Sequence, residues 1–371
     1  MPWRKKRDTE QRDLLSNQTR TSGLLNFVLA ASVLAIAYTD WIVVENDSLG
    51  YLYVLPVALS GLVNPLYITV SLSILCAYLQ DVFGPPDDPI HVRIIRALIS
   101  LGGYLIIGYV VTHVAQQRSR LEARIRQERD DYEKDLTLAA QVQRQVLPAP
   151  PAMPGIELAA GMQTARLLGG DYYDFYPISK DTVDIVIADV SGKGAAASLL
   201  MPSLAVALRL RAHELPGPAA IIKDLDTVLK QITTPATFVT VFYARINPER
   251  RTLEYACGGH NPPLLIRPTT GETILLDGAG PIVGILPDAE FTDSFLSLQH
   301  GDILTLYTDG VTEQENPDLE QFSTDRLKQV VLQNETDSAS AIINRITDAV
   351  STFAGPKEQE DDLTVVVAKI L

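Results

Sequence analysis

The chain has 371 residues, which is long enough for two or more folded units. Its two cysteines, Cys76 and Cys257, provide no disulfide framework and are consistent with a reducing cytoplasm. Its formal net charge of −14 belongs entirely to residues 148–371, which contain 16 basic and 30 acidic residues, because residues 1–147 contain 15 of each. Since a phosphate backbone would repel the acidic part, this charge distribution excludes nucleic acid as a partner.

Residues 24–114 predict a membrane domain of about four spans, behind a basic cytoplasmic tail at residues 1–23. The apolar run 24–44 contains a single charged residue, Asp40, and has the length of one span. Asp40 could be a functional ionisable group, but we expect it at the membrane interface.

The uncharged run at residues 50–80 is too long for one span. As a single helix it would measure about 46 Å, more than a hydrocarbon core of about 30 Å. We therefore expect two short spans joined by a turn at Asn64–Pro65. A fourth span is expected near residues 97–114. The alternative is that these segments are buried helices of a soluble domain.

Basic residues on both flanks of this region indicate its orientation. Six precede the first span and four follow the last, namely Arg4, Lys5, Lys6, Arg7, Arg12 and Arg20, then Arg118, Arg120, Arg124 and Arg126. Because basic residues are retained on the cytoplasmic side, an even number of spans places both flanks there. This predicts a multi-pass protein of the cell membrane, in contact with the lipid bilayer, whose C-terminal domain lies in the cytoplasm. Arg93 and Arg96, at the outer end of the last span, depart from the rule.

Residues 115–147 contain many Gln, Arg and Glu residues and neither Gly nor Pro, which predicts one continuous linker helix. Its apolar residues follow an irregular heptad pattern at Leu121, Ile125, Tyr132, Leu136, Ala139, Val142 and Val146. The pattern favours a coiled-coil-like pairing of two copies, and so a homodimer. A solvated helix lying along its own domain is the alternative. The Pro-rich residues 148–151 end the helix, and residues 152–371 form the last domain.

This last domain mixes strands and helices. Strands are predicted near residues 156–162, 183–189, 237–246, 252–257, 262–267, 303–307 and 363–370. Helices are predicted near residues 195–212, 217–231, 323–333 and 338–354. Strands dominate the middle of the domain and helices come in pairs, which indicates an α+β fold.

Four short aspartate motifs are the most informative feature of this domain. They are Gly-Gly-Asp-Tyr at 169–172, Asp-Val-Ser-Gly-Lys-Gly at 189–194, Tyr-Thr-Asp-Gly at 307–310 and Asp-Asp-Leu-Thr at 361–364. Most lie beside an apolar run that predicts a strand, so folding could bring the carboxylates to one edge of a sheet. Carboxylates this close raise one another's pKa values unless divalent cations supply positive charge. Oxygen ligands favour Mg²⁺ or Mn²⁺ over zinc.

The order and the residues of these motifs resemble those of the metal-dependent (PPM, protein phosphatase 2C-like) serine/threonine phosphatases, specifically the bacterial SpoIIE/RsbU type. The resemblance covers roughly residues 141–371. It includes Gln-Val-Leu-Pro at 145–148, Phe-Val-Thr-Val-Phe-Tyr at 238–243 and Gly-Gly-His-Asn-Pro-Pro at 258–263. Each motif alone is weak evidence, whereas together, in the family's order, they are highly specific.

The resemblance implies a PPM-type β-sandwich flanked by helices, with a centre that binds two Mn²⁺ or Mg²⁺ ions. Asp189 would bridge the two ions, with the Val190 carbonyl beside it. Asp171 would serve one ion, and Asp309 and Asp361 the other. The ions would hold and orient a hydroxide for in-line attack on a phosphoserine, and no covalent enzyme intermediate is required.

The implied activity is that of a membrane-anchored protein serine/threonine phosphatase. The family resemblance implies a phosphorylated STAS-type anti-sigma-factor antagonist as the protein substrate, within a partner-switching pathway that controls gene expression. The competing interpretation is a catalytically silent sensor or docking module of the same fold. The four aspartate motifs favour the enzyme, since a silent protein has no need of such a charge cluster.

Several neighbouring residues have simpler interpretations. Asp174 and Asp362 could assist the metal ligands or bind a third ion, although an aspartate next to a ligand is more often a solvated turn residue. His260 could act as a general acid, but we expect it to hydrogen-bond the backbone within a rigid turn. Cys257 is expected to be a small buried hydrophobe.

Two other known sequence signatures match this chain only in part. The segment Ser-Gly-Lys-Gly at 191–194 lacks the first glycine of a phosphate-binding P-loop, where this chain has Ile187, and lacks the Ser or Thr that follows the lysine. The segment Gly-Gly-Asp-Tyr-Tyr at 169–173 lacks the Glu-Phe pair of the diguanylate cyclase signature. That family would also leave the three later aspartate motifs unexplained.

Overall fold

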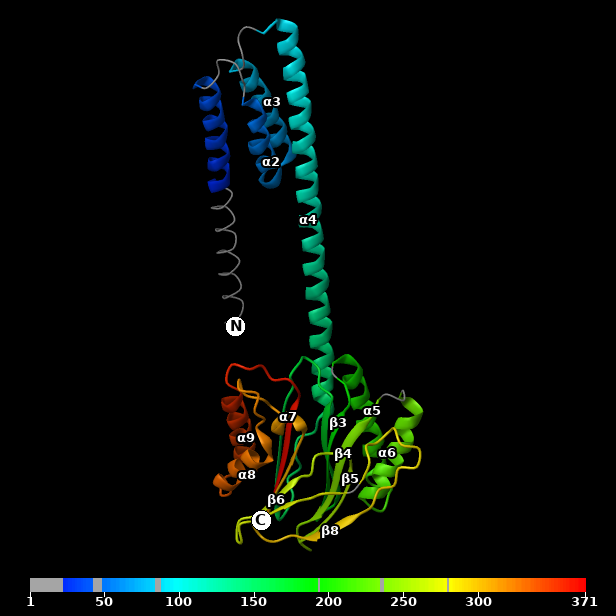
Figure 1. Cartoon of the computed structure of the whole chain (residues 1–371). Helices are drawn as coiled ribbons and strands as arrows, with labels where there is room; N and C mark the ends of the chain where they lie inside the picture. The colour runs from blue at the N-terminus through cyan, green and yellow to red at the C-terminus, as the bar shows by residue number, and fades with distance from the viewer. Residues whose placement is uncertain (1–22, 43–48, 84–87, 193, 234–236, 279) are drawn as a thin grey trace. The chain divides into compact units, whose positions relative to one another are not determined.

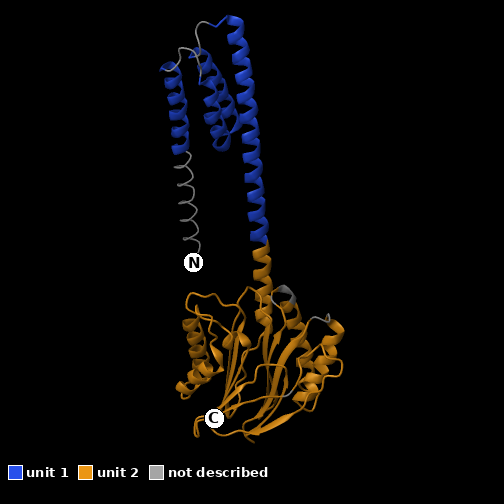
Figure 2. Ribbon diagram, viewed as in Figure 1, with its two compact units in different colours: residues 1–131 blue, residues 132–371 orange. Residues whose placement is uncertain are grey.

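A computed structural model describes residues 23–42, 49–83, 88–192, 194–233, 237–278 and 280–371. The chain divides into two compact units, residues 1–131 and residues 132–371 (Figure 2). The first unit contains only helices among its described residues, whereas the second contains all of the described strands. Apart from Gly23, the predicted basic tail lies outside the described residues.

Helices separated by short connections make up the first unit (Figure 1). The first helix spans Gly23–Ile42. It is followed by the 3₁₀ helix η1, Gly50–Tyr53, and by α2, Val54–Val63, and α3, Leu66–Val82. The chain turns at Asn64–Pro65, as predicted, where both residues have an extended backbone. The proline explains the break, because it disfavours a helical conformation in the residue before it.

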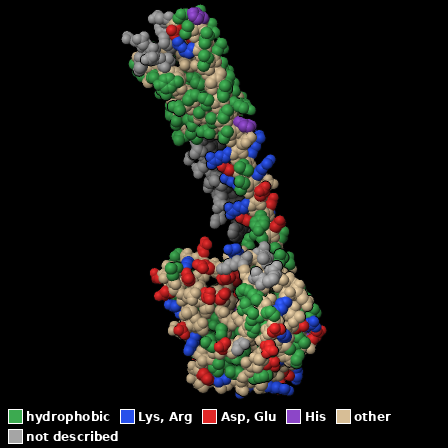
Figure 3. All heavy atoms as spheres, turned by 45° about the vertical axis from the view of Figure 1, so that its right-hand side comes forward, with side chains coloured by type: hydrophobic (Ala, Val, Ile, Leu, Met, Phe, Trp, Pro, Cys, Tyr) green, Lys and Arg blue, Asp and Glu red, His purple; other side chains and the backbone are tan. Residues whose placement is uncertain are grey.

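The described surface of the first unit is largely apolar (Figure 3). Phe27, Leu62 and Ile99 are 73%, 62% and 70% exposed. The helices Gly23–Ile42 and Ile90–Val146 are each long and apolar enough to cross a membrane, and the helices between them are apolar but shorter. Large exposed apolar patches mark membrane or protein interaction surfaces in general.

The predicted fourth span and the predicted linker form one uninterrupted helix, α4, Ile90–Val146. It begins earlier than the expected residue 97. The two arginines that departed from the charge rule explain this start, because Arg93 pairs with Asp81 (2.9 Å) and Arg96 pairs with Asp88. Their charges are therefore balanced near the beginning of the helix.

Two five-stranded antiparallel sheets form the second unit, in the strand orders β1-β10-β9-β6-β7 and β2-β3-β4-β5-β8. The strands are β1 Ile156–Gln163, β2 Asp171–Ser179, β3 Thr182–Val190, β4 Val239–Asn247, β5 Thr252–Gly258, β6 Leu264–Arg267, β7 Glu272–Leu275, β8 Ser294–Ser297, β9 Ile303–Tyr307 and β10 Leu363–Ile370. The other helices are α5 Ala195–Arg211, α6 Pro218–Ile232, α7 Asp309–Thr312, α8 Ser323–Gln333 and α9 Ala339–Ala354. The predicted α+β sandwich flanked by helices is confirmed.

Helices lie on the outer faces of the sheets (Figure 1), and three apolar cores hold these layers together. Ile187 and Phe242 lie in the core between the two sheets. Helices α5 and α6 pack on the sheet of β2 to β5 through a second core that includes Met201 and Ile222. Helices α8 and α9 pack on the other sheet through a third core that includes Ile346. Both outer faces are therefore covered, and the ends of the strands are left for a functional site.

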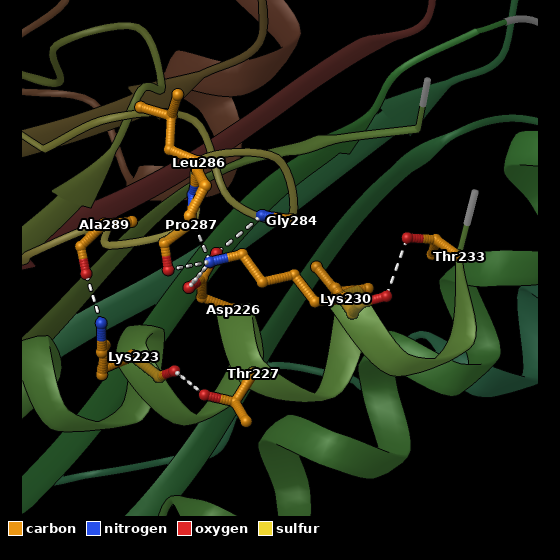
Figure 4. A network of polar contacts seen from close by, with 10 residues as sticks. Lys223, Asp226, Thr227, Lys230, Thr233, Gly284, Leu286, Pro287 and Ala289 are labelled. Carbon is orange, nitrogen blue, oxygen red and sulfur yellow. Dashed lines mark hydrogen bonds and ion pairs between the residues drawn. The ribbon is translucent and has the colours of Figure 1, made fainter. Parts of the chain in front are cut away.

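Polar contacts attach the long loop before β8 to α6 (Figure 4). Asp226 accepts a hydrogen bond from the Gly284 amide (2.9 Å) and pairs with Lys230 (2.6 Å). Lys230 also donates to the carbonyl oxygens of Leu286 and Pro287. The buried carboxylate of Asp226 is thus neutralised within its own helix and fixes the loop.

Sequence periodicity missed β2, β7, β8 and α7. In β2, residues 171–176 are all buried, so the apolar and polar residues do not alternate, and Asp171, Asp174 and Pro177 weaken the strand signal. The other three elements have only four residues each, too few to establish a period.

Candidate metal centre

The ends of four strands bring the aspartate motifs together. Asp171 begins β2 and lies opposite Asp189, near the end of β3. In the other sheet, β9 ends just before Asp309, and β10 begins just after Asp361. Because β9 and β10 are antiparallel neighbours, the end of the first lies beside the start of the second. The four predicted ligands therefore approach one edge of the sandwich, two from each sheet.

Threonine side chains connect the two sheets at this edge. Asp171 is 2% exposed, and its Oδ2 accepts hydrogen bonds from Oγ1 of Thr308 (2.8 Å) and of Thr364 (2.5 Å). Burial and the charge of Asp189 raise the pKa of Asp171 well above its usual range. Both threonines belong to the aspartate motifs, but the sequence analysis assigned them no role.

Asp189 has the electrostatic surroundings expected of a cation ligand. Burial and the charges of Asp309, Asp361 and Asp362 raise the pKa of Asp189 to about 7. No described Lys or Arg side chain forms an ion pair with Asp171 or Asp189, and Lys193 lies outside the described residues. A divalent cation would supply the missing positive charge, so this set of oxygen atoms fits Mg²⁺ or Mn²⁺.

Glycines let the backbone approach the centre closely. A Cβ atom on Gly170 would lie 2.9 Å from the Val190 carbonyl oxygen, and one on Gly310 would clash with the Asp362 carbonyl. A small pocket at this point is lined by residues that include Arg166, Gly170, Asp189, Gly192, Asp361 and Asp362. The pocket is therefore lined by backbone, by carboxylates and by one guanidinium group, the kinds of group that bind a cation or a phosphate-bearing ligand.

The carboxylates alone do not form a finished coordination shell. Within the described part of the chain, no three Asp, Glu, His or Cys side chains are close enough together to hold an ion. Asp171 is instead directed at its two threonines. Mg²⁺ usually keeps several waters and takes only one or two carboxylates, so backbone oxygens and water would complete the shell.

Asp362 positions the loop that precedes β2. It is 7% exposed, and its two carboxylate oxygens accept hydrogen bonds from the amides of Ala165 (2.9 Å) and Gly170 (2.8 Å). It is therefore not a solvated turn residue. Both oxygens are used to hold the backbone beside the predicted ligands.

Asp174 is not a solvated turn residue, and its contacts are structural. It is 1% exposed, pairs with Arg209 of α5 (2.7 Å) and accepts a hydrogen bond from the Tyr172 hydroxyl (2.5 Å). Because side chains alternate along a strand, Asp174 points to the opposite face of β2 from Asp171. Arg209 also donates to the Val146 carbonyl (2.6 Å), so this pair secures the C-terminal end of α4.

His260 is buried and neutral. Its Nδ1 lies 2.8 Å from the Thr240 hydroxyl, and the ring also interacts with the backbone of Tyr307, so a side-chain partner joins the backbone partner that we expected. Burial lowers the pKa of His260 to about 4, which disfavours the general-acid role. Cys257 is buried as expected, and burial raises the pKa of its thiol.

Arg166 is the functional candidate that the sequence analysis missed. Its side chain is exposed and lines the pocket beside Asp189 and Asp361. A guanidinium group is suited to bind phosphate oxygens. The sequence placed Arg166 just before the Gly-Gly-Asp-Tyr motif, but only the fold shows that it faces the carboxylates.

Comparisons with known proteins agree with this geometry. Residues 179–371 match the family model described as stage II sporulation protein E (SpoIIE). Over 268 residues the chain is 29% identical to the phosphoserine phosphatase RsbU of Bacillus subtilis (strain 168), covering 71% of this chain and 77% of that protein. Over 184 residues it is 29% identical to the phosphoserine phosphatase RsbP of the same organism, covering 48% of this chain and 45% of that relative.

Solved structures share the fold. The SiaA PP2C domain of Pseudomonas aeruginosa superposes with a TM-score of 0.60 at 20% identity, covering 66% of this chain and 99% of that one. The structure of the PP2C phosphatase domain of Bacillus subtilis SpoIIE with a fragment of its regulatory domain gives 0.52 at 20% identity, covering 59% of this chain and 64% of that one. The second unit therefore has the PP2C-type fold.

Proposed function

The chain belongs to the SpoIIE family, and from this membership we propose that it is a metal-dependent protein serine/threonine phosphatase. The observation that best supports the proposal is the convergence of Asp171, Asp189, Asp309 and Asp361 from four strand ends. The names of the relatives RsbU and RsbP, both phosphoserine phosphatases, support the same reaction. A catalytically silent docking module would have no use for buried carboxylates that repel one another.

We assign the metal ligands as the sequence predicted. Asp189 would bridge two ions together with the Val190 carbonyl, Asp171 would serve one ion, and Asp309 and Asp361 the other. When bound, Mn²⁺ or Mg²⁺ supplies Lewis-acid activation of water and neutralises phosphate charge.

The chain's own residues orient the reaction partners. The hydroxyls of Thr308 and Thr364 fix the Asp171 carboxylate, and Asp362 fixes the loop at Gly170. We assign Arg166 to the phosphate oxygens of the substrate, because it is the basic described residue that lines the pocket. Arg166→Ala should raise the KM for a phosphoprotein by about tenfold and leave the metal dependence unchanged; an unaltered KM would argue against this role.

The decisive test uses the full chain in detergent with an aryl phosphate and a phosphoserine protein as substrates. Hydrolysis should require Mn²⁺ or Mg²⁺, and Asp189→Asn should lower kcat by at least about 10³-fold, which corresponds to about 4 kcal/mol of transition-state stabilisation. Asp348→Asn is the matched control, since Asp348 is exposed on α9. Full activity in excess chelator, or in Asp189→Asn, would overturn the proposal.

We further propose that the substrate is a phosphorylated STAS-type antagonist of an anti-sigma factor, in a partner-switching pathway. Support comes from the relatives RsbU and RsbP, and from a solved structure of the RsbU and RsbW domains of Rv1364c from Mycobacterium tuberculosis with a similar fold (TM-score 0.51, 24% identity). Removal of phosphate from such an antagonist, and not from an unrelated phosphoserine protein, is the expected specificity.

We also propose a multi-pass membrane anchor at residues 24–114, a linker at 115–147 and a cytoplasmic phosphatase domain at 152–371. The exposed apolar side chains of the first unit support the anchor. Reporter fusions after Gln18 and after Gln117 should both be cytoplasmic, and one at residues 85–89 should lie outside. Opposite locations of the first two would mean an odd number of spans.

A homodimer through the linker completes the proposal. Leu121, Ile125 and Tyr132 are 59%, 56% and 63% exposed on α4, and such apolar side chains favour a second helix as a partner. The double variant Leu121→Asp with Ile125→Asp should lower the mass measured by light scattering in detergent and change the rate on a protein substrate. A variant that stays dimeric with unchanged rates would make the linker a spacer.

A further inference from the structure

We propose that the first unit binds a small monovalent cation, a proton or an alkali-metal ion, at a buried polar site around Asp40. The site lies where the helix Gly23–Ile42, η1, α3 and α4 contribute polar groups to one place. It shares no residue with the metal centre of the second unit. The inference therefore stands independently of the phosphatase activity.

The Asp40 carboxylate is the charged member of this site. Its side chain is fully buried within the protein, at 0% exposure. Oδ1 accepts a hydrogen bond from the Leu49 amide (2.7 Å). Oδ2 is buried and has no hydrogen-bond partner among the described residues. A buried carboxylate oxygen in this situation is strongly unfavourable unless a proton or a cation joins it.

Other buried hydroxyl groups lie near enough to interact electrostatically with the carboxylate. The Tyr53 side chain is also 0% exposed, and its hydroxyl likewise has no partner among the described residues. The Tyr104 hydroxyl of α4 lies 2.6 Å from the Gly50 carbonyl and 2.9 Å from Oε1 of Gln80. Two fully buried oxygen atoms from different elements, Asp40 Oδ2 and Tyr53 Oη, thus lack the hydrogen-bond partners that buried polar atoms normally have.

No basic side chain balances Asp40 in the described part of this unit. The described ion pairs of this unit involve other carboxylates on α3, on α4 and in the connection between them, namely Arg93–Asp81, Arg96–Asp88 and Arg118–Glu122. The neighbouring segments 43–48 and 84–87 lie outside the described residues, but their sequences contain no Lys, Arg or His. A bound proton or alkali-metal ion would supply the positive charge that the described side chains around Asp40 do not.

The other titratable groups that face Asp40 are neutral in their ordinary states. Tyr53 on η1, Cys76 on α3 and Tyr104 on α4 interact electrostatically with one another or with Asp40. Val57 adds an apolar wall from α2. Divalent cations take six or more oxygen ligands, among which carboxylates are joined by several waters or carbonyl oxygens. One carboxylate with a few neutral oxygens suits a single positive charge.

The experiment uses the full chain in lipid nanodiscs and the fluorescence of Trp41, the residue next to Asp40. Since the chain has two tryptophans, Trp3→Phe leaves Trp41 as the only one. We expect one fluorescence transition during an acid titration in choline chloride, or during a NaCl or KCl titration against choline chloride at fixed pH and ionic strength. A response to acid alone identifies the proton, and a response to Na⁺ or K⁺ identifies the metal ion.

Matched variants decide whether Asp40 is responsible. Asp40→Asn should abolish the transition, Asp40→Glu should retain it, and Tyr53→Phe should shift its midpoint by about two- to tenfold. Asp88→Asn is the control and should respond like the parent, because Asp88 already pairs with Arg96. Thermal unfolding shows whether each variant is folded, and if Asp40→Asn is not, the Tyr53→Phe midpoint decides. The absence of any transition in the parent, an unchanged transition in Asp40→Asn, or an unshifted midpoint in Tyr53→Phe would overturn the proposal.

Discussion

Buried aspartates in two regions of the second unit differ in whether a basic side chain balances their charge. On the side covered by α5 and α6, each of three buried aspartates has a basic partner, in the pairs Asp174–Arg209, Asp184–Arg245 and Asp226–Lys230. At the edge where the strands end, Asp171 and Asp189 interact with hydroxyl groups and other carboxylates and form no ion pair among the described residues, although Arg166 lines the pocket beside Asp189. The first arrangement stabilises the fold, and the second requires a ligand.

This difference teaches how to separate structural from functional aspartates. A buried carboxylate with an internal counter-ion has its charge already balanced, so it gains little from a metal. One without such a counter-ion is left with an unbalanced charge and is suited to bind a cation. Asp174, three residues from Asp171 in the same strand, shows that closeness in sequence does not decide which kind a residue is.

The largest effect is expected from a structural pair. Asp184 is fully buried and bonded to Arg245 (2.8 Å) and to the Tyr243 hydroxyl (2.7 Å). Asp184→Ala would leave the mostly buried Arg245 without its partner and should lower the free energy of unfolding by about 3 kcal/mol, measured by urea denaturation. Phosphatase activity per folded molecule should be unchanged. Loss of activity without loss of stability would contradict the comparison.

Metal binding should stabilise the other region by a somewhat smaller amount. A saturating Mn²⁺ or Mg²⁺ concentration of 100 times Kd should add about 2.7 kcal/mol to the free energy of unfolding of the second unit. Asp189→Asn should lose this gain, whereas Asp184→Asn should keep it. Thermal scans with and without the metal measure the difference, and an equal gain in all three proteins would place the ion elsewhere.

The smallest effect concerns pH in metal-free protein. Because the folded-state pKa of Asp189 is raised from 3.8 to about 7, the folded protein binds a proton more tightly than the unfolded chain. This contribution is fully present below about pH 4 and is lost as the pH rises toward about 7, by at most about 1.4 kcal/mol per pH unit. Metal-free protein should therefore gain stability from this group on mild acidification. In Asp189→Asn, or with bound metal, this part of the pH dependence should disappear.

The sequence by itself determined the α+β class, most strand and helix positions, and the four aspartate motifs. Local periodicity and turn chemistry suffice for these, because Asn64–Pro65 breaks a helix and an apolar run such as 303–307 forms a strand whatever surrounds it. The sequence also shows that the whole acidic excess lies in residues 148–371, the part of the chain that contains the candidate metal centre.

Only the tertiary structure decided which aspartates share an environment. Asp171 and Asp174 have similar neighbours in the sequence, but the alternation of β2 directs one toward Asp189 and the other toward Arg209. The roles of Thr308 and Arg166, and the complete burial of Asp40, likewise depend on segments that lie far apart in the chain. Electrostatic surroundings are set by what packs against a carboxylate in space, and that information is absent from any short stretch of sequence.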